Sequence, residues 1–378
     1  MFVVVPETNP NPSRIRLARL RRGLTKVALA PLVGFSAKML SEYENGHAMP
    51  TPAAIDALSS VLKFPPSFFY RADLDEPDRQ GVSFRSLASM TTRQQDSVLA
   101  AVAMAFELSE WIDHRFELEP VDLPDLRDND PHQAAMMLRN YWGIGTRPIG
   151  NMVHLLESKG VRVFSLTERA KQVDACSLWY RDAPFVFLNT MKTVEHSRMD
   201  AAHELGHLVL HRHVGPRGRS VEPEAKAFGS AFLMPEESVS SAVPRMPAPT
   251  MEQMVQLKAH WGVSLAALAF RLNRLGILPD WSYRRVCIEL ASYGRTREPF
   301  PMPERETSAV LARVFSMLRE TGTTKADVAK QLDLYTDDLD ALIFGLGVLA
   351  ATEAGQSKAD PKAAALRRQF KVYEGSGA

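Results

Sequence analysis

The sequence contains only two cysteines, Cys176 and Cys287, among its 378 residues. Two cysteines so far apart cannot supply a disulfide framework or a Cys-x-x-Cys metal site, and they favour a reducing compartment. Apolar runs reach only about ten residues, whereas a membrane span needs about 20. The N-terminal segment MFVVVPETNPNPSR has neither the basic start nor the long apolar core of a secretion signal. These absences predict a cytoplasmic protein with no membrane segment.

An excess of charge of one sign is also missing from the whole chain. The 45 Lys and Arg residues almost balance the 44 Asp and Glu residues, so overall charge points neither to nucleic acid nor to a membrane. The local distribution differs, because residues 1–64 carry eight basic and four acidic side chains. A hydrophobic fraction of 45% and a charged fraction of 24% are typical of globular proteins.

The chain is long enough for two or three domains, and its patterning predicts a mostly helical α+β fold. Residues 12–70 form short amphipathic segments separated by turn residues, which indicates a compact helical bundle. We expect a helical connector at 71–130, a domain with a small sheet at 131–295 and a helical module at 305–350. The tail at 351–378, rich in Ala, Gly, Ser and Lys, has the composition of a disordered segment.

Within the central domain, three short runs have strand character: 161–166, 174–180 and 184–189. The last two are close enough to form a hairpin around Arg181, Asp182 and Ala183. Helical periodicity predicts helices on both sides of these strands, at 132–142, 148–159, 194–213, 222–233, 250–275 and 280–293. The domain should therefore be a small sheet backed by helices.

The strongest chemical signal is the run His203-Glu204-Leu205-Gly206-His207. Histidines four residues apart lie on one face of a helix, so both imidazoles can bind one metal ion. Glu204 can lie close to a water bound by zinc, whose pKa the ion lowers toward neutrality, and can accept its proton. Gly206 allows another backbone to approach closely. The short pattern also occurs by chance in unrelated helices, where the two histidines would have no metal.

A third ligand is needed to complete such a site. His213 lies at the position of the third histidine ligand in zincins that use three histidines. In those proteins a glycine three residues earlier lets the chain turn back toward the metal, but this sequence has Leu210 there. Glu224, at the start of the segment EAKAFGSAFLMP, is the better candidate, and Glu222 is the alternative. His211 extends the histidine stripe, but a histidine near a helix C-terminus is more often favoured by the helix dipole, so it is left out of the site.

The runs AAHELGHLVLH and EAKAFGSAFLMP resemble the ImmA/IrrE family of metallopeptidases, as do RPIGNMVHLLESKGVRVF, PFVFLN and WGVSLAALAFRL. The resemblance covers residues 130–290. It implies a Zn²⁺ site in which His203, His207 and Glu224 are the ligands and Glu204 is the catalytic general base. Lys226 stands where the family commonly has Asn or Asp. For the group that stabilises the oxyanion, the sequence offers only Tyr180, Tyr283 and Arg198, with no spacing to choose among them.

Residues 14–64 resemble the Xre/Cro-type helix-turn-helix domain in the segments RLARLRRGLT, ALAPLVGFS, LSEYENGHAMPT and AIDALSSVLKFPPSFF. In that fold the third helix enters the major groove of double-stranded DNA. The resemblance and the local basic excess imply DNA contacts from Lys26, Ser36, Ala37, Lys38 and Ser41. Lys26 replaces a frequent Gln, and Glu42 is acidic at a position that is commonly neutral or basic. A bundle used for dimerisation or for docking a protein partner would leave the same hydrophobic pattern.

Two functions of different classes follow. The first is a DNA-binding regulatory zinc metallopeptidase, whose substrate the resemblance implies to be a helix-turn-helix repressor, cleaved to derepress stress, phage or mobile-element genes. The second is a transcription regulator whose peptidase-like domain senses a ligand or metal without proteolysis. A toxin–antitoxin or defence-system component is a further alternative. The implied partners are operator DNA and the repressor, and homodimer formation stays open.

Overall fold

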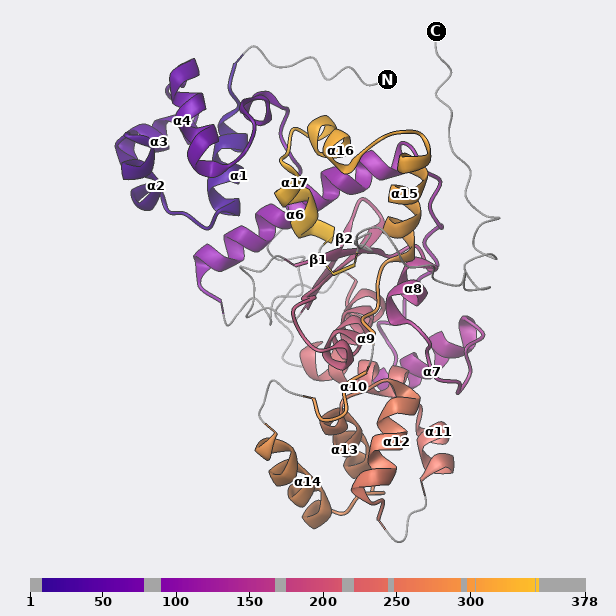
Figure 1. The fold of residues 1–378 in the computed structure, drawn as a ribbon. Helices are drawn as coiled ribbons and strands as arrows, with labels where there is room; N and C mark the ends of the chain where they lie inside the picture. Colours follow the sequence, from indigo (N-terminus) through magenta and orange to yellow (C-terminus); the bar gives the residue numbers. More distant parts are fainter. Residues whose placement is uncertain are drawn as a thin grey trace, which may run out of the picture.

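The computed structural model describes residues 9–77, 90–166, 175–212, 221–243, 248–293, 298–302, 304–343 and 345–346 (Figure 1). Within these ranges the chain is mostly helical with one three-stranded sheet, which confirms the α+β prediction. His213 and the tail at 351–378 lie outside the described residues. No helix in the described ranges is long and apolar enough to span a membrane.

The sheet consists of β1 (Arg162–Ser165), β2 (Ala175–Tyr180) and β3 (Ala183–Leu188) in the order β1-β3-β2. β1 runs parallel to β3, and β2 pairs antiparallel with β3. Arg181 and Asp182 connect the hairpin with φ angles of 45° and 63°. Two successive residues in the left-handed region give a turn whose twist matches that of the strands, so the predicted hairpin is confirmed.

Helices cover both faces of this sheet. On one face lies α6 (Thr92–Asp113), whose Phe106 ring stacks on Tyr180 with centroids 3.9 Å apart and meets Phe185 edge-on at 4.9 Å. On the other face lies α9 (Val194–Leu210), and the indole nitrogen of Trp179 donates to the Leu208 carbonyl. Figure 1 shows the sheet between these two helices. The helix with the histidines is therefore fixed against a rigid layer.

α10 (Val221–Leu233) crosses α9 at very short range. A β-carbon on Gly206 would lie 3.1 Å from the Phe228 ring and 3.2 Å from Ala225 Cα. A β-carbon on Gly229 would lie 3.0 Å from the backbone nitrogen of His203. The two glycines therefore let the helix backbones touch. This confirms the expectation that Gly206 admits another backbone.

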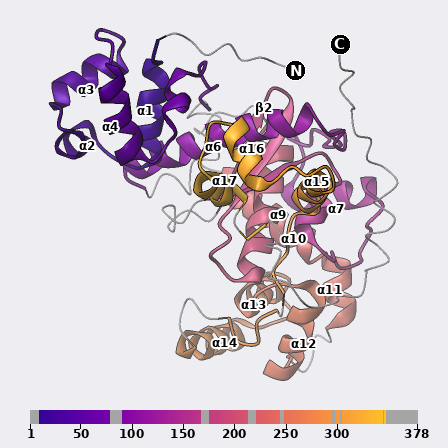
Figure 2. The same cartoon turned by 45° about the horizontal axis from the view of Figure 1, so that its top comes forward.

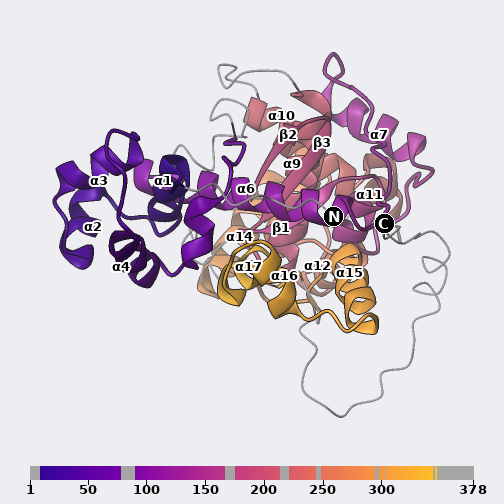
Figure 3. The ribbon, with the colours of Figure 1, turned by 90° about the horizontal axis from the view of Figure 1, so that it is seen from above.

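The N-terminal helices are α1 (Pro12–Arg21), α2 (Lys26–Val33), α3 (Ala37–Glu44) and α4 (Pro52–Leu62), and a 3₁₀ helix follows at Pro66–Tyr70. Thr25, Ser36 and Thr51 begin three of these helices, because each side-chain oxygen accepts a backbone N–H of the first turn. α1 packs against α6. Figures 1 and 3 show α2 and α3 on the side of this bundle that faces away from the rest of the molecule.

The remaining helices of the central region are α7 (Pro131–Tyr141), α8 (Met152–Glu157), α11 (Glu236–Ala242), α12 (Met251–Trp261), α13 (Leu265–Arg274) and α14 (Asp280–Ser292). The continuous helix expected at 250–275 is wrong. Gly262 ends α12 with a φ of 64°, and Ser264 caps the start of α13. Figure 2 shows α11–α14 grouped at one end of the molecule, beyond α10.

Three C-terminal helices, α15 (Ala309–Glu320), α16 (Lys325–Gln331) and α17 (Thr336–Ile343), return to the N-terminal half of the chain. The buried Glu157 carboxylate of α8 accepts hydrogen bonds from the start of α15, including the Ala309 N–H at 2.8 Å. The Arg22 guanidinium, at the end of α1, donates to both oxygens of Asp338 at 2.6 Å. These helices therefore join the N-terminal bundle to the sheet domain.

Candidate metal centre

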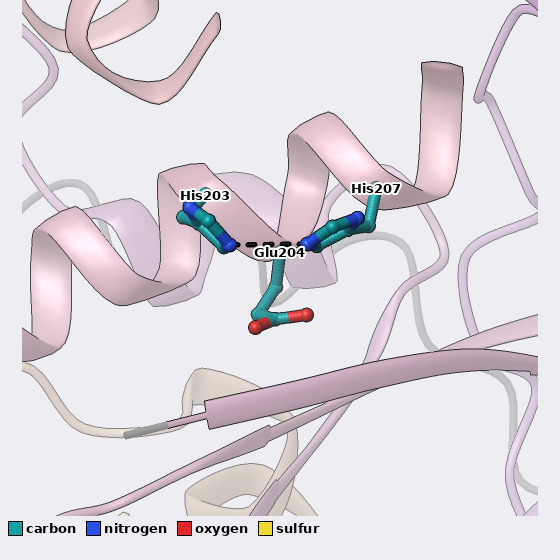
Figure 4. Close-up of side chains that lie close together, drawn as sticks. All are labelled: His203, Glu204 and His207. Atoms are coloured by element: carbon teal, nitrogen blue, oxygen red, sulfur yellow. Dashed lines mark hydrogen bonds between the residues drawn. The ribbon is translucent and has the colours of Figure 1, made fainter. Parts of the chain in front are cut away.

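His203 and His207 lie one helical turn apart on α9, with Thr193 capping the start of the helix. Their Nε2 atoms face each other at 3.0 Å, as Figure 4 shows. The His207 side chain is buried, whereas the His203 side chain keeps 23% of its surface exposed. The donor atoms of His203, Glu204 and His207 lie within 4.8 Å of one another. The predicted HExxH geometry is therefore present.

A carboxylate from α10 closes this arrangement. Glu222 Oε2 lies 3.3 Å from His203 Nε2, and its Oε1 lies 3.5 Å from His207 Nε2. With zinc bonds of 2.0–2.2 Å to nitrogen and oxygen, two ligand atoms of a tetrahedral site are about 3.3 Å apart. The three separations in this structure match that edge. Two imidazoles and one carboxylate are also a donor set that zinc enzymes use, with one position left for water. The residues present therefore fit a zinc ion.

Glu224, the third ligand expected from the sequence, lies elsewhere. Its Oε2 is 3.0 Å from Nε2 of His211, the residue that ends α9. Residues two apart on a helix are separated by a rotation of about 200° around the helix axis. Glu222 and Glu224 therefore project from opposite sides of α10 and cannot face the same point. The structure thus brings Glu222, the alternative, to the histidine pair, and it brings in His211, which the sequence analysis left out.

Glu204 points from α9 toward the sheet, as Figure 4 shows. Its side chain is buried, and its Oε2 accepts a hydrogen bond of 2.6 Å from Ser177 Oγ on β2. The hydrogen bond therefore holds the carboxylate close to the donor atoms of both histidines, on the side of α9 that faces the sheet. Sequence reasoning missed Ser177. The only signal was a polar residue at an alternate position of a strand, on the side that faces α9.

Acidic groups surround His203. Burial opposes its protonated form, but the hydrogen bond with Glu222 and the neighbouring Glu204 outweigh burial and raise the pKa of His203. Burial works against the Glu222 carboxylate in the same way, and its bonds to His203 and His207 lower its pKa well below the usual range. One turn before His203, burial raises the pKa of Asp200 to about 6. Such a concentration of carboxylates favours a cation.

The residues considered for oxyanion stabilisation do not reach this site. Arg198 is buried in a pair with Glu306, and the Tyr180 hydroxyl donates to Asp75 from the opposite face of the sheet. Tyr283 lies on α14. Lys226, at the position where the resemblance predicts an orienting amide or carboxylate, has its Nζ 5.1 Å from the Phe270 ring centre.

In the N-terminal bundle, the residues expected to contact DNA divide into two groups. Ser36 and Lys38 are exposed at the start of α3. Lys26, Ala37 and Ser41 are half-buried, and Lys26 Nζ donates to Ser41 Oγ at 2.9 Å. Lys26 and Ser41 therefore join α2 to α3. In the first group, Ser36 Oγ caps α3 by accepting the Met39 N–H, and the Lys38 side chain is exposed.

The N-terminal bundle and the domain with the histidine pair each match a known protein family. Residues 15–69 match the family model of the helix-turn-helix domain, and residues 156–273 match that of the IrrE N-terminal-like domain, a peptidase family. No curated protein matches the chain. The second match contains the histidine pair, Glu204 and both carboxylates of α10, and the first contains α2 and α3. Residues 15–69 thus match an Xre-type helix-turn-helix domain and residues 156–273 match an IrrE N-terminal-like peptidase domain, the combination that the sequence predicts.

Proposed function

We propose that this protein is a DNA-binding regulator with a zinc-dependent peptidase site on α9 and α10. The observation that supports this most strongly is the set of separations of 3.0, 3.3 and 3.5 Å among His203, His207 and Glu222, which suits a tetrahedral zinc ion. The helix-turn-helix match at 15–69 supports binding of double-stranded DNA.

In this proposal His203, His207 and Glu222 hold the ion. A zinc ion bound there would polarise a peptide carbonyl and make water a better nucleophile at neutral pH. His203 and Glu222 have the more exposed side chains, at 23% and 22%, so substrate would approach from their side. His207, at 6%, lies at the buried end of the site.

Glu204 supplies the acid–base chemistry. Its carboxylate accepts a proton from the attacking water and then delivers it to the nitrogen of the leaving amine. The hydrogen bond from Ser177 Oγ occupies one side of Oε2 and holds the carboxylate in a single orientation. A fixed orientation matters because proton transfer requires the base within hydrogen-bond reach of the reacting atoms.

We also propose that the substrate is a helix-turn-helix repressor. Support comes from the resemblance to the ImmA/IrrE family and from the chain's own DNA-binding domain, which would bring the peptidase site to the promoters where such a repressor sits.

The direct test is zinc content together with cleavage of a co-expressed neighbouring repressor, in the native protein and in Glu204→Gln. We expect stoichiometric zinc in both proteins and cleavage only by the native one. Glu237→Gln, which changes an exposed carboxylate on α11, is the matched control and should cleave normally. Zinc binding without cleavage of any candidate would exclude the peptidase function, and cleavage that survives in Glu204→Gln would belong to a contaminant.

A sensor without proteolysis is the second candidate, favoured by the contacts between the regions. Arg22, which follows α1, is bound to Asp338 of α17, and Arg71 lies 2.7 Å from Glu107 of α6. In this function, occupation of the metal site changes the position of the DNA-binding helices, and these contacts transmit the change. If zinc changes the affinity for the chain's own promoter and no repressor is cleaved, the sensor function is the correct one.

A further inference from the structure

Beyond the ligands, a second line of polar side chains starts at His207 and leads away from the metal centre. His207 Nδ1 lies 3.1 Å from His211 Nδ1, and His211 Nε2 lies 3.0 Å from Glu224 Oε2. The histidines occupy successive turns of α9, and the glutamate comes from the first turn of α10. The His207 and His211 side chains are 6% and 8% exposed, so water has little access to either ring.

The carboxylate at the end of this line determines where the protons lie. Glu224 can only accept a hydrogen bond, so Nε2 of His211 must carry the hydrogen. A neutral His211 then has a bare Nδ1, which can only accept. His207 must therefore carry its hydrogen on Nδ1 and donate it to His211. This leaves a lone pair on Nε2 of His207, the atom that faces His203 at 3.0 Å.

The opposite proton arrangement places two acceptors against each other. If His207 carried its hydrogen on Nε2, its bare Nδ1 would need a hydrogen from Nδ1 of His211. The Nε2 of a neutral His211 would then meet the Glu224 carboxylate with no hydrogen between them, at a distance of 3.0 Å. Such a contact is costly for the His211 ring, whose side chain is only 8% exposed, although the Glu224 side chain keeps 38% of its surface exposed. With His211 neutral, only the first arrangement satisfies every atom of the line.

We propose that His211 and Glu224 are positioning residues that fix the tautomer and ring orientation of His207, so that its Nε2 is ready to bind the metal. This inference rests on the proposed zinc site. It assigns the two carboxylates of α10 different tasks: Glu222 binds the ion, and Glu224 acts through His211. Both glutamates lie in the first turn of α10, where Glu222 faces His203 and His207 and Glu224 faces His211.

The resulting experiment measures zinc affinity by competition with a chromophoric chelator, in the native protein and four variants. His211→Phe keeps the ring but removes both nitrogens, and we expect about 10- to 100-fold weaker zinc binding, the usual effect of losing such a partner. Glu224→Ala should weaken binding within the same range. Glu224→Gln should be milder, because its amide oxygen can still accept from His211. Glu222→Ala removes a ligand and should weaken binding more than any of these.

His260→Phe and Glu237→Ala serve as matched controls, since both original side chains are exposed and lie outside this line. Both should bind zinc like the native protein. A second readout distinguishes positioning from simple packing. Long-range proton–nitrogen NMR of the histidine rings should show His207 protonated at Nδ1 in the native protein and a mixture of tautomers in His211→Phe.

The outcomes separate this inference from the proposed function. If Glu224→Ala abolishes zinc binding while Glu222→Ala leaves it intact, Glu224 is the third ligand and the positioning role is overturned, although the zinc site stands. Unchanged affinity in His211→Phe, or His207 protonated at Nε2 in the native protein, would also overturn it. Failure of the native protein to bind zinc would remove the zinc site itself, and the inference with it.

Discussion

Two pairs of helices in this molecule each bring polar side chains together, and they do so in opposite ways. Between α1 and α3, the buried Arg19 guanidinium donates to both oxygens of Glu44, one at 2.8 Å, and to the Leu24 carbonyl at 2.7 Å. Donors there match acceptors. Between α9 and α10, the Nε2 atoms of His203 and His207 and the Glu222 carboxylate converge on one point.

The contrast separates a structural network from a ligand site. A buried ion pair whose donors match its acceptors stabilises the relative position of two helices. Acceptors that converge need a cation or a proton between them. The first arrangement should therefore respond to mutation through stability, and the second through binding and catalysis.

Loss of the general base should give the largest effect. Glu204→Gln keeps the shape of the side chain, and its amide can still contact Ser177, but it can no longer accept a proton. We expect kcat/KM for repressor cleavage to fall about 10²- to 10⁴-fold, the usual contribution of acid–base catalysis. Zinc content and the free energy of unfolding should stay at native values. A variant that lost zinc as well would show that Glu204 acts as a ligand.

Breaking the matched network should affect stability instead. Glu44→Ala leaves the Arg19 charge buried without its partner, and we expect the free energy of unfolding of the N-terminal bundle to fall by about 3–5 kcal/mol. Urea denaturation followed by circular dichroism measures this change. Glu42→Ala, in the same helix, should cost less than about 0.5 kcal/mol. Equal losses in the two variants would mean that Arg19–Glu44 adds nothing beyond helix propensity.

A pH-dependent effect should arise at Glu157, which links α8 to α15. Burial raises the pKa of Glu157 to about 7 against an ordinary 4.5, although hydrogen bonds from Ser308 and from the N–H groups of Val310 and Ala309 oppose this. Between pH 4.5 and about 7, Glu157 therefore keeps its proton in the folded state but has lost it in the unfolded chain. The stabilisation is complete below pH 4.5 and disappears as the pH rises through 7.

Glu157→Gln cannot titrate, so its free energy of unfolding should decline less than that of the native protein between pH 4.5 and 8, by roughly 3 kcal/mol. Urea denaturation across this range measures the difference between the two proteins. Glu117→Gln, an exposed residue, should follow the native curve. Parallel curves for the native protein and Glu157→Gln would contradict a raised pKa at this position.

The smallest effect should come from the outer face of α3. Lys38 is exposed there, and Lys38→Ala should remove about one phosphate contact. The slope of log affinity against log salt concentration should become shallower by about one. A fluorescence-anisotropy titration with promoter DNA at several salt concentrations measures it. Lys63→Ala, at the end of α4, should leave the slope unchanged, and a shift there would place the DNA on another face.

Sequence alone predicted the local features of the site. The four-residue spacing of His203 and His207 and the strand patterns on each side of the hairpin are properties of short segments. The identity of the third carboxylate is not local, since Glu222 and Glu224 differ only in the direction they take from α10. That direction depends on how α10 is rotated against α9, which Gly206 and Gly229 fix by allowing the backbones to touch.

The Ser177 contact and the break at Gly262 also show which features a short segment reveals and which depend on contacts between elements. Nothing in the strand pattern said that Ser177 lies opposite Glu204, because that contact joins positions 27 residues apart across a sheet and a helix. The break at Gly262 was visible in principle, since a glycine followed by a serine cap is a stop and start signal. The apolar periodicity on both sides obscured it.

The bond between Arg22 and Asp338 joins positions 316 residues apart. During synthesis at about 5–20 residues per second, roughly 15–60 s pass between the emergence of the first and of the second. For that interval the helix-turn-helix bundle exists without its C-terminal partner. Nascent or truncated chains would thus present a DNA-binding domain released from the contacts that hold it in the finished protein.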